Sequence, residues 1–365
     1  MKKLILLILS IFIFSCNDPV FYSISMEELP LDPRIAGPST NFAELNGKMY
    51  VAAKKTIYIY ENKNDPDTDS WKTKNVSGRV THLAALENKL YALIENLIIP
   101  LSEAITEEAP ISVPGQSIQS IFAVENTLFI GTWFRDANNN YAETNSIWYL
   151  KEGETQPSQI TGGGFSILCG AASDNYNFYL CCKDKNGIFY MPKDTPGTAI
   201  LVNDSKDKDF TGIINLNAEN TAAMSRDGKL FLITSAKITE SVKYNDGRKA
   251  TSAIGIWKNE TYSLLLTGKQ DLTNTVSTGY THGYVEIEFN AATGSITGTS
   301  FYEPGKIVPS SISENTYEHY SSSIGKHGVN YFYQAPDGVL FASLNNGVWS
   351  YRERSAGKFT WNAEE

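Results

Sequence analysis

The sequence predicts an all-β domain built from consecutive repeats, preceded by a short N-terminal segment of different character. A turn that leads into a short strand of bulky residues recurs along the chain, and a second strand signature follows each copy. The copies are spaced by about 40–50 residues, a repeat length typical of several stacked β architectures. No stretch shows the apolar spacing of a long amphipathic helix, which argues against an α/β fold.

The first signature is a turn rich in Asn, Asp and Gly that leads into two or three bulky residues. These residues favour tight hairpins because they tolerate backbone conformations with positive φ. The bulky residues that follow are expected to form a strand with a buried face. The clear copies occupy residues 46–51, 87–92, 125–130, 174–180, 227–232 and 337–342, and a weaker copy occupies 293–298.

The second signature is a β-branched residue beside a bulky one, and several copies follow a glycine. It predicts a further strand in each repeat, separated from the first by a turn. The pairs are Ile57-Tyr58, Ile98-Ile99, Ile147-Trp148, Ile188-Phe189, Ile256-Trp257, Ile307-Val308 and Val348-Trp349.

Several short strands in every repeat predict the blades of a β-propeller, with seven blades favoured and six as the alternative. A sheet of this size cannot bury both of its faces alone, whereas blades packed around an axis give each sheet two apolar neighbours. The number depends on the degenerate copy at 293–298, which also fits an insertion. We therefore expect one propeller domain over residues 42–365.

The best single copy, residues 337–351, resembles the propeller repeat of two-component regulators. That repeat has an Asp-Gly turn, here Asp337-Gly338, then a strand, a short Asn/Gly turn, and a second strand ending in an aromatic residue, here Tyr351. Residues 227–231 match half of this pattern. The resemblance implies a periplasmic propeller of the kind that detects carbohydrate breakdown products, but no kinase follows it here, so a signalling role is not expected. More broadly, the chain resembles the β-propeller lipoproteins of Gram-negative envelopes.

The N-terminal segment predicts export and lipid attachment. Lys2 and Lys3 precede an almost unbroken apolar run over residues 4–14, which is the pattern of a secretory signal peptide. The alternative is a membrane-spanning helix, but the run is shorter than the ~20 residues that a span needs. The sequence up to Cys16 resembles a lipobox, which implies removal of residues 1–15 and lipidation of Cys16. Residues 16–41 contain several prolines and are expected to tether the lipid to the propeller.

Charge and cysteine content narrow the range of partners. The formal net charge is −9, so the chain repels phosphate backbones and no nucleic acid partner is expected. Asn17 favours the outer membrane, because Asp at this position retains enteric-type lipoproteins in the inner membrane. Beyond Cys16 the cysteines are Cys169, Cys181 and Cys182, an odd number that is not a disulfide framework. Two interpretations remain open for Cys169 and Cys181: a disulfide across a hairpin, or small apolar strand residues.

Two connections within the repeats are longer than the others, at residues 132–145 and 234–253. If both join the second and third strands of their blades, both emerge on one face and flank the fourth blade. Long loops on a rigid scaffold concentrate binding residues. The alternative is that they are tolerated insertions. The candidate ligand-binding residues on these connections are Trp133, Arg135, Tyr141, Tyr244 and Arg248, with rings to stack on a sugar or anchor a partner and arginines to pair with acids.

No motif of catalysis or cofactor binding stands out. None of the four histidines has the spacing of a metal site, and no Gly-x-Ser-x-Gly elbow is present. We therefore expect no catalytic residue, metal or cofactor. The predicted function is a lipid-anchored, non-catalytic module at the cell envelope that binds an oligosaccharide or acts as a scaffold for an envelope protein. The alternative is a carbohydrate-active hydrolase or lyase, because the geometry of paired carboxylates is not readable from sequence.

Overall fold

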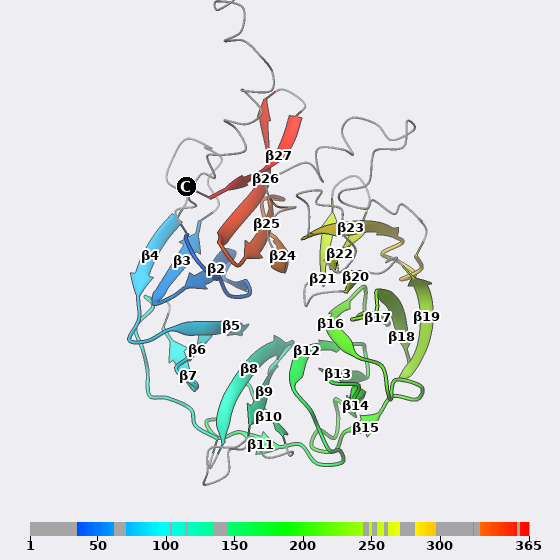
Figure 1. Cartoon of the computed structure of the whole chain (residues 1–365). Coiled ribbons are helices and arrows are strands. Elements are labelled where there is room, and N and C mark those ends of the chain that lie inside the picture. Colours follow the sequence, from blue (N-terminus) through cyan, green and yellow to red (C-terminus); the bar gives the residue numbers. More distant parts are fainter. Residues whose placement is uncertain are drawn as a thin grey trace, which may run out of the picture.

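The computed structural model describes residues 35–61, 71–102, 104–113, 116–133, 145–243, 248–249, 254–258, 262–270, 282–296, 324, 329–355 and 358–364. The elements assigned across these residues are all β-strands, and they form seven small antiparallel sheets around a central axis (Figure 1). The predicted seven-bladed β-propeller is therefore confirmed, and the six-bladed alternative is wrong.

Blades I to IV follow one another along the chain, and in each blade the first strand lies nearest the axis (Figure 1). Blade II has three strands and the other three blades have four. Blade I consists of β1 (Ala43–Leu45), β2 (Lys48–Ala53), β3 (Thr56–Tyr60) and β4 (Trp71–Asn75). Blade II consists of β5 (Val80–Leu86), β6 (Lys89–Ile94) and β7 (Leu97–Leu101). Blade III consists of β8 (Ser117–Val124), β9 (Thr127–Trp133), β10 (Ser146–Lys151) and β11 (Ser158–Gln159). Blade IV consists of β12 (Leu168–Ser173), β13 (Asn177–Cys182), β14 (Gly187–Pro192) and β15 (Ile200–Leu201).

Blades V to VII complete the ring, and blade VI has the least regular order. In blade VI, β22 lies between β21 and β23, and the short β20 pairs with the far end of β22. Blade V consists of β16 (Phe210–Asn215), β17 (Asn220–Ser225), β18 (Lys229–Thr234) and β19 (Lys237–Lys243). Blade VI consists of β20 (Arg248–Lys249), β21 (Ile254–Lys258), β22 (Tyr262–Gln270) and β23 (His282–Phe289). Blade VII consists of β24 (Val329–Gln334), β25 (Leu340–Leu344), β26 (Gly347–Ser355) and β27 (Lys358–Ala363).

The described core is divided among the contacts between blades. It comprises seven apolar clusters, one for each pair of neighbouring blades. Between blades III and IV, for example, the rings of Phe129 and Phe178 meet edge to face with centroids 5.2 Å apart. Burial of each large side chain contributes about 1.5–3 kcal/mol. Each sheet thus depends on both of its neighbours, as the repeat pattern requires.

The ring closes between blades VII and I through backbone and side-chain contacts rather than through a strand shared by the two sheets. The indole of Trp71 in blade I donates a hydrogen bond to Glu364, at 2.7 Å. On the N-terminal side, Ser39 shares a 2.8 Å hydrogen bond with Ser343 of blade VII. Ile35 is fully buried in the same joint. Ile35 is therefore part of the packed joint between blades VII and I.

The alternating strand directions give the propeller two distinct faces. We call the face where the first strand of each blade begins the start face, and the face where it ends the end face. The turns between first and second strands, such as Asn46-Gly47 and Glu125-Asn126, lie on the end face. The predicted positive φ is present at Asn46 (52°) and Gly47 (71°). The second strands end, and the third strands begin, on the start face.

Two predicted repeat copies lie on other strands than expected. The copy at 227–232 leads into β18, the third strand of blade V, and not into the second. The second strand, β17, contains Ala222 and Ala223 where other blades have bulky residues, so it lacks the signature. The copy at 293–298 follows β23 and does not supply the second strand of blade VI, and Ile256-Trp257 lies in that blade's first strand.

The predicted equivalence of the two long connections is consequently wrong. Residues 132–145 do join the second and third strands of blade III, whereas 234–253 include the fourth strand of blade V and lead into blade VI. The strands before and after the two connections nevertheless all reach the start face. Both β9 and β19 run from the end face to the start face, and both β10 and β21 begin there.

Candidate binding site on the start face

Five of the seven first strands contain a one-residue β-bulge near the start face. In each case the register with the second strand shifts beside the first or second residue of the strand. Bulges re-aim side chains and often lie beside functional sites. The bulged residues are Thr81 in β5, Gln119 in β8, Cys169 in β12, Thr211 in β16 and Asn330 in β24.

Four of the five bulged side chains form hydrogen bonds with their own blade. In three blades the side chain donates to the backbone carbonyl of the opposing residue on the second strand, so the bulge leaves no polar group unsatisfied there. The pairs are Thr81 with Leu93 at 3.4 Å, Cys169 with Cys181 at 3.3 Å and Thr211 with Met224 at 3.3 Å. Asn330 donates instead to the side chain of Asn345, at 3.1 Å.

Blades II and III differ because they contain buried polar atoms without a partner. The side-chain oxygen of Gln119 is buried and has no hydrogen bond, and the same is true of Nδ1 of His82, which follows the bulge in β5. A third such atom, Nε1 of Trp148, lies in the third strand of blade III. A buried polar atom left unpaired costs about 1–3 kcal/mol. The unpaired atoms of His82 and Gln119 lie on neighbouring first strands, near the same face.

His82 is held uncharged by its surroundings. Burial, with a smaller contribution from the positive charge of Lys183, lowers the pKa of His82 from 6.5 to about 4. Its ring meets Phe122 of β8 edge to face, with centroids 6.0 Å apart. At neutral pH the imidazole is therefore a neutral hydrogen-bonding group beside an aromatic ring.

Tyr331, which follows the bulge in β24 of blade VII, also lies near the start face. Burial raises the pKa of Tyr331 to about 12, and the thiol of Cys169, three blades away, adds to the shift. His82, Gln119, Cys169 and Tyr331 thus lie near the start-face ends of the first strands of four different blades.

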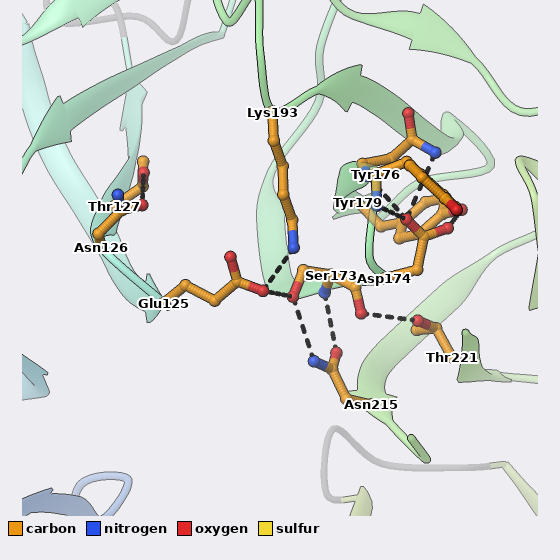
Figure 2. A network of polar contacts seen from close by, with 11 residues as sticks. Glu125, Asn126, Thr127, Ser173, Asp174, Tyr176, Tyr179, Lys193, Asn215 and Thr221 are labelled. Carbon is orange, nitrogen blue, oxygen red and sulfur yellow. Dashed lines mark hydrogen bonds and ion pairs between the residues drawn. The ribbon is translucent and has the colours of Figure 1, made fainter. Parts of the chain in front are cut away.

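The end face carries a network of paired polar groups that includes the buried residues Ser173 and Asp174 (Figure 2). Glu125 of blade III accepts hydrogen bonds from Ser173, at 2.8 Å, and from Lys193, at 2.5 Å, both in blade IV. The backbone amide of Ser173 donates to Asn215 of blade V at 2.8 Å. These contacts connect three consecutive blades.

Asp174 anchors a second part of this network. Its carboxylate accepts the backbone amides of Tyr176 and Asn177, each at 2.7 Å, and the hydroxyl of Tyr179 at 2.5 Å. Tyr179 in turn accepts the backbone amide of Ala236 in blade V, at 3.1 Å. Burial, followed by the hydrogen bond to Asp174, raises the pKa of Tyr179. This arrangement stabilises the turn and the joint, so we assign it a structural role.

Of the residues predicted to bind a ligand, the structure describes the side chain of Trp133 only. Trp133 is partly buried at the start-face end of β9, where it pairs in register with Ser117. Arg248 lies in β20 opposite Gln270, at the same end of its blade, but its side chain lies outside the described residues. Arg135, Tyr141, Tyr244 and the lipid-attachment residue Cys16 also lie outside them.

Sequence reasoning missed His82, Gln119 and Tyr331. They lie on first strands, which carry neither repeat signature. A faint signal exists, since a polar residue interrupts an apolar strand at each position, as in Val80-Thr81-His82-Leu83. Such an interruption is common in strands and by itself indicates no site.

Neither a metal site nor a membrane span is found in the part of the chain that the structure describes. In those ranges no three His, Cys, Asp or Glu side chains come close enough to hold a metal ion. No helix within the same ranges has the length and apolarity needed to cross a bilayer.

The chain is similar to known proteins in fold only. No family model and no curated protein sequence matches it. The chain is similar to the WD40 β-propeller domain of Doa1, with a TM-score of 0.56 and 11% identity over 88% of this chain and 94% of that one. At this level of identity the likeness establishes a β-propeller and nothing about its ligand.

Two further similar structures are bacterial and lie outside the cytoplasm. One is the extracellular domain of a one-component system from B. thetaiotaomicron, with a TM-score of 0.53, 10% identity, and coverage of 88% of this chain and 39% of that one. The other is PorZ, a surface component of the type-IX secretion system of Porphyromonas gingivalis, with a TM-score of 0.50, 12% identity, and coverage of 91% and 39%. The fold thus matches bacterial extracellular propeller domains.

Proposed function

We propose that the chain is a non-catalytic binding module, held at the outer membrane by a lipid on Cys16, whose ligand site is the start face. The observation that carries the proposal is the pair of buried, unpartnered atoms, Nδ1 of His82 and the side-chain oxygen of Gln119. Buried polar groups in proteins are almost always paired, and the exceptions call for an explanation. The explanation we propose is a bound ligand that forms hydrogen bonds with these two atoms.

The chemistry of the site favours an uncharged ligand rich in hydroxyl groups, such as an oligosaccharide. The shifted pKa values leave His82 and Tyr331 both uncharged at neutral pH. Imidazole, carboxamide and phenol groups all exchange hydrogen bonds with sugar hydroxyls. Phe122, beside His82, offers an apolar ring to the same ligand. An envelope protein that presents hydroxyl or amide groups is the other partner we consider.

The loop residues Trp133, Arg135, Tyr141, Tyr244 and Arg248 extend the proposed site. The strands that flank both long connections reach the start face, which is the face that also holds His82 and Gln119. Loops beside an axial site are well placed to contact a ligand larger than the axis admits.

The binding proposal is tested with residues 17–365 on a glycan array, followed by incubation of each bound glycan and analysis of the products. We expect saturable binding to one group of uncharged glycans and no bond cleavage. Cleavage of a bound glycan would favour the hydrolase or lyase alternative. Binding confined to polyanionic glycans would contradict the neutral site described here.

Lipid anchoring is tested separately with Cys16→Ser. We expect the parent chain to carry acyl groups by mass spectrometry and to sediment with outer membranes, whereas the variant lacks acyl groups and stays uncleaved. The similarity to extracellular and surface domains supports this location. Acyl groups retained on the variant would contradict the assignment of Cys16.

A further inference from the structure

Blade IV carries two thiols at positions where other blades carry a hydroxyl and an apolar side chain. Cys169 occupies the bulge in β12 and Cys181 faces it on β13. In blades II and V the same two positions are Thr81 with Leu93, and Thr211 with Met224. Cys169 donates to the opposing carbonyl just as the threonines do. A threonine would therefore serve the fold equally well, and the thiol needs a separate explanation.

The two sulfur atoms are already in contact. The Sγ atoms of Cys169 and Cys181 are 3.4 Å apart. The bulge produces this contact, because both Cys169 and Gly170 lie opposite Cys181 and the two thiols share the joint between blades IV and V. A disulfide has an S–S distance of about 2.05 Å, so small side-chain rotations separate the two states.

Cys182 is excluded from this pair by the geometry of the strand. Successive side chains in a strand point to opposite faces of the sheet. Cys182 accordingly packs in the joint between blades III and IV, on the other side of the sheet from Cys181. The pairing is thus fixed, and Cys182 supplies a buried reference thiol next to it in the sequence.

We propose that Cys169 and Cys181 form a redox pair that closes to a disulfide by exchange with a protein or small-molecule disulfide. The thiolate of Cys169 attacks the oxidant's disulfide, forming a mixed disulfide and releasing one thiol of the oxidant. The deprotonated sulfur of Cys181 then attacks Sγ of Cys169 and releases the second. Two electrons pass from the cysteine sulfurs to the oxidant's disulfide, and the two protons end on its thiols.

The environments of the two thiols determine that Cys169 reacts first and Cys181 second. Cys169 is only partly buried, whereas Cys181 is fully buried. Burial raises the pKa of the Cys181 thiol, so it stays protonated until a mixed disulfide forms beside it. The new bond would fix the bulge of β12 near the start face. The proposal does not depend on the ligand site.

The test uses the full chain, reduced and then incubated in glutathione buffers from fully reduced to fully oxidised. After acid quenching, free thiols are alkylated in denaturant. All three cysteines lie between Lys151 and Lys183, in one tryptic peptide, so Cys16 does not interfere. Chymotryptic cleavage at Phe178 or Tyr179 then separates Cys169 from the other two. We expect the oxidised peptide to stay joined until it is reduced, with Cys182 alone alkylated and a higher Tm for the oxidised chain.

Two variants make the result specific. Cys169→Thr keeps the hydrogen bond that the threonines make in blades II and V, and we expect full alkylation of Cys181 and Cys182 in it. Cys182→Ser is expected to form the bond as the parent chain does. Full alkylation of Cys169 and Cys181 in the most oxidising buffer would overturn the proposal. A bond to Cys182, or a mixed disulfide with glutathione that persists on Cys169, would overturn it as well.

Discussion

The two faces of this propeller contain buried polar groups that are satisfied to different degrees. On the end face, the buried carboxylate of Asp174 accepts two backbone amides and the hydroxyl of Tyr179, and the exposed Glu125 connects blade III to blade IV (Figure 2). On the start face, His82 of blade II and Gln119 of blade III keep buried atoms unpaired. The same repeat, turned around one axis, thus carries a satisfied buried carboxylate at one face and unpaired buried atoms at the other.

In this account, the paired groups of the end face stabilise the fold, and the unpaired groups of the start face serve binding. A satisfied buried network fixes the joints between blades. An unpaired buried atom lowers stability and is retained where binding restores the hydrogen bond, which is where local rules are expected to fail. Changes on the end face should therefore alter stability without altering binding, whereas changes on the start face should alter binding.

The largest expected effect is on the end face, with Asp174→Ala. The substitution removes the acceptor for two backbone amides and leaves the hydroxyl of Tyr179 without its partner. We expect a loss of about 3–5 kcal/mol in the free energy of unfolding, measured by urea denaturation at pH 7. Asp174→Asn keeps one acceptor oxygen and should lose less. A loss below about 1 kcal/mol would show that the network does not stabilise the joint.

The next effect is the pH dependence caused by His82. The folded protein lowers the pKa of His82 from 6.5 to about 4, so the unfolded chain binds a proton first as pH falls. Stability is therefore fully present above pH 6.5 and is lost as pH falls toward 4, by about 3 kcal/mol. His82→Gln should remove this part of the slope, as measured by urea unfolding between pH 7 and 4. Equal slopes for both chains would contradict the burial of an uncharged His82.

The smallest expected effect comes from backbone strain in a turn of the end face. Glu87, in the turn between β5 and β6, has a φ of 50° that favours glycine. Glu87→Gly should stabilise the protein by about 0.5–1 kcal/mol, visible as a higher urea midpoint. Destabilisation would indicate that the Glu87 side chain contributes more than its backbone strain costs.

The fold was predictable from the sequence because bulky strand residues and turn residues recur at a fixed spacing. The assignment of strands failed in blade V, where Ala222 and Ala223 make the second strand too small to carry the signature. The start-face site was not predictable. The pattern places Gln119 in a strand, but whether its oxygen finds a partner depends on side chains of neighbouring blades.

The central claim, that the start face binds the ligand, is tested most directly by comparing the two faces in one binding assay. Any glycan found on the array is titrated against Gln119→Ala and Trp133→Ala, and against Tyr176→Ala, whose ring is 73% exposed on the end face. Aromatic platforms contribute about 1–3 kcal/mol per stacked ring, and we expect a loss in that range for Trp133→Ala and a measurable loss for Gln119→Ala. Tyr176→Ala should bind as the parent chain does, and all three variants should keep its Tm. Loss of binding in Tyr176→Ala, with the start-face variants unaffected, would contradict the account.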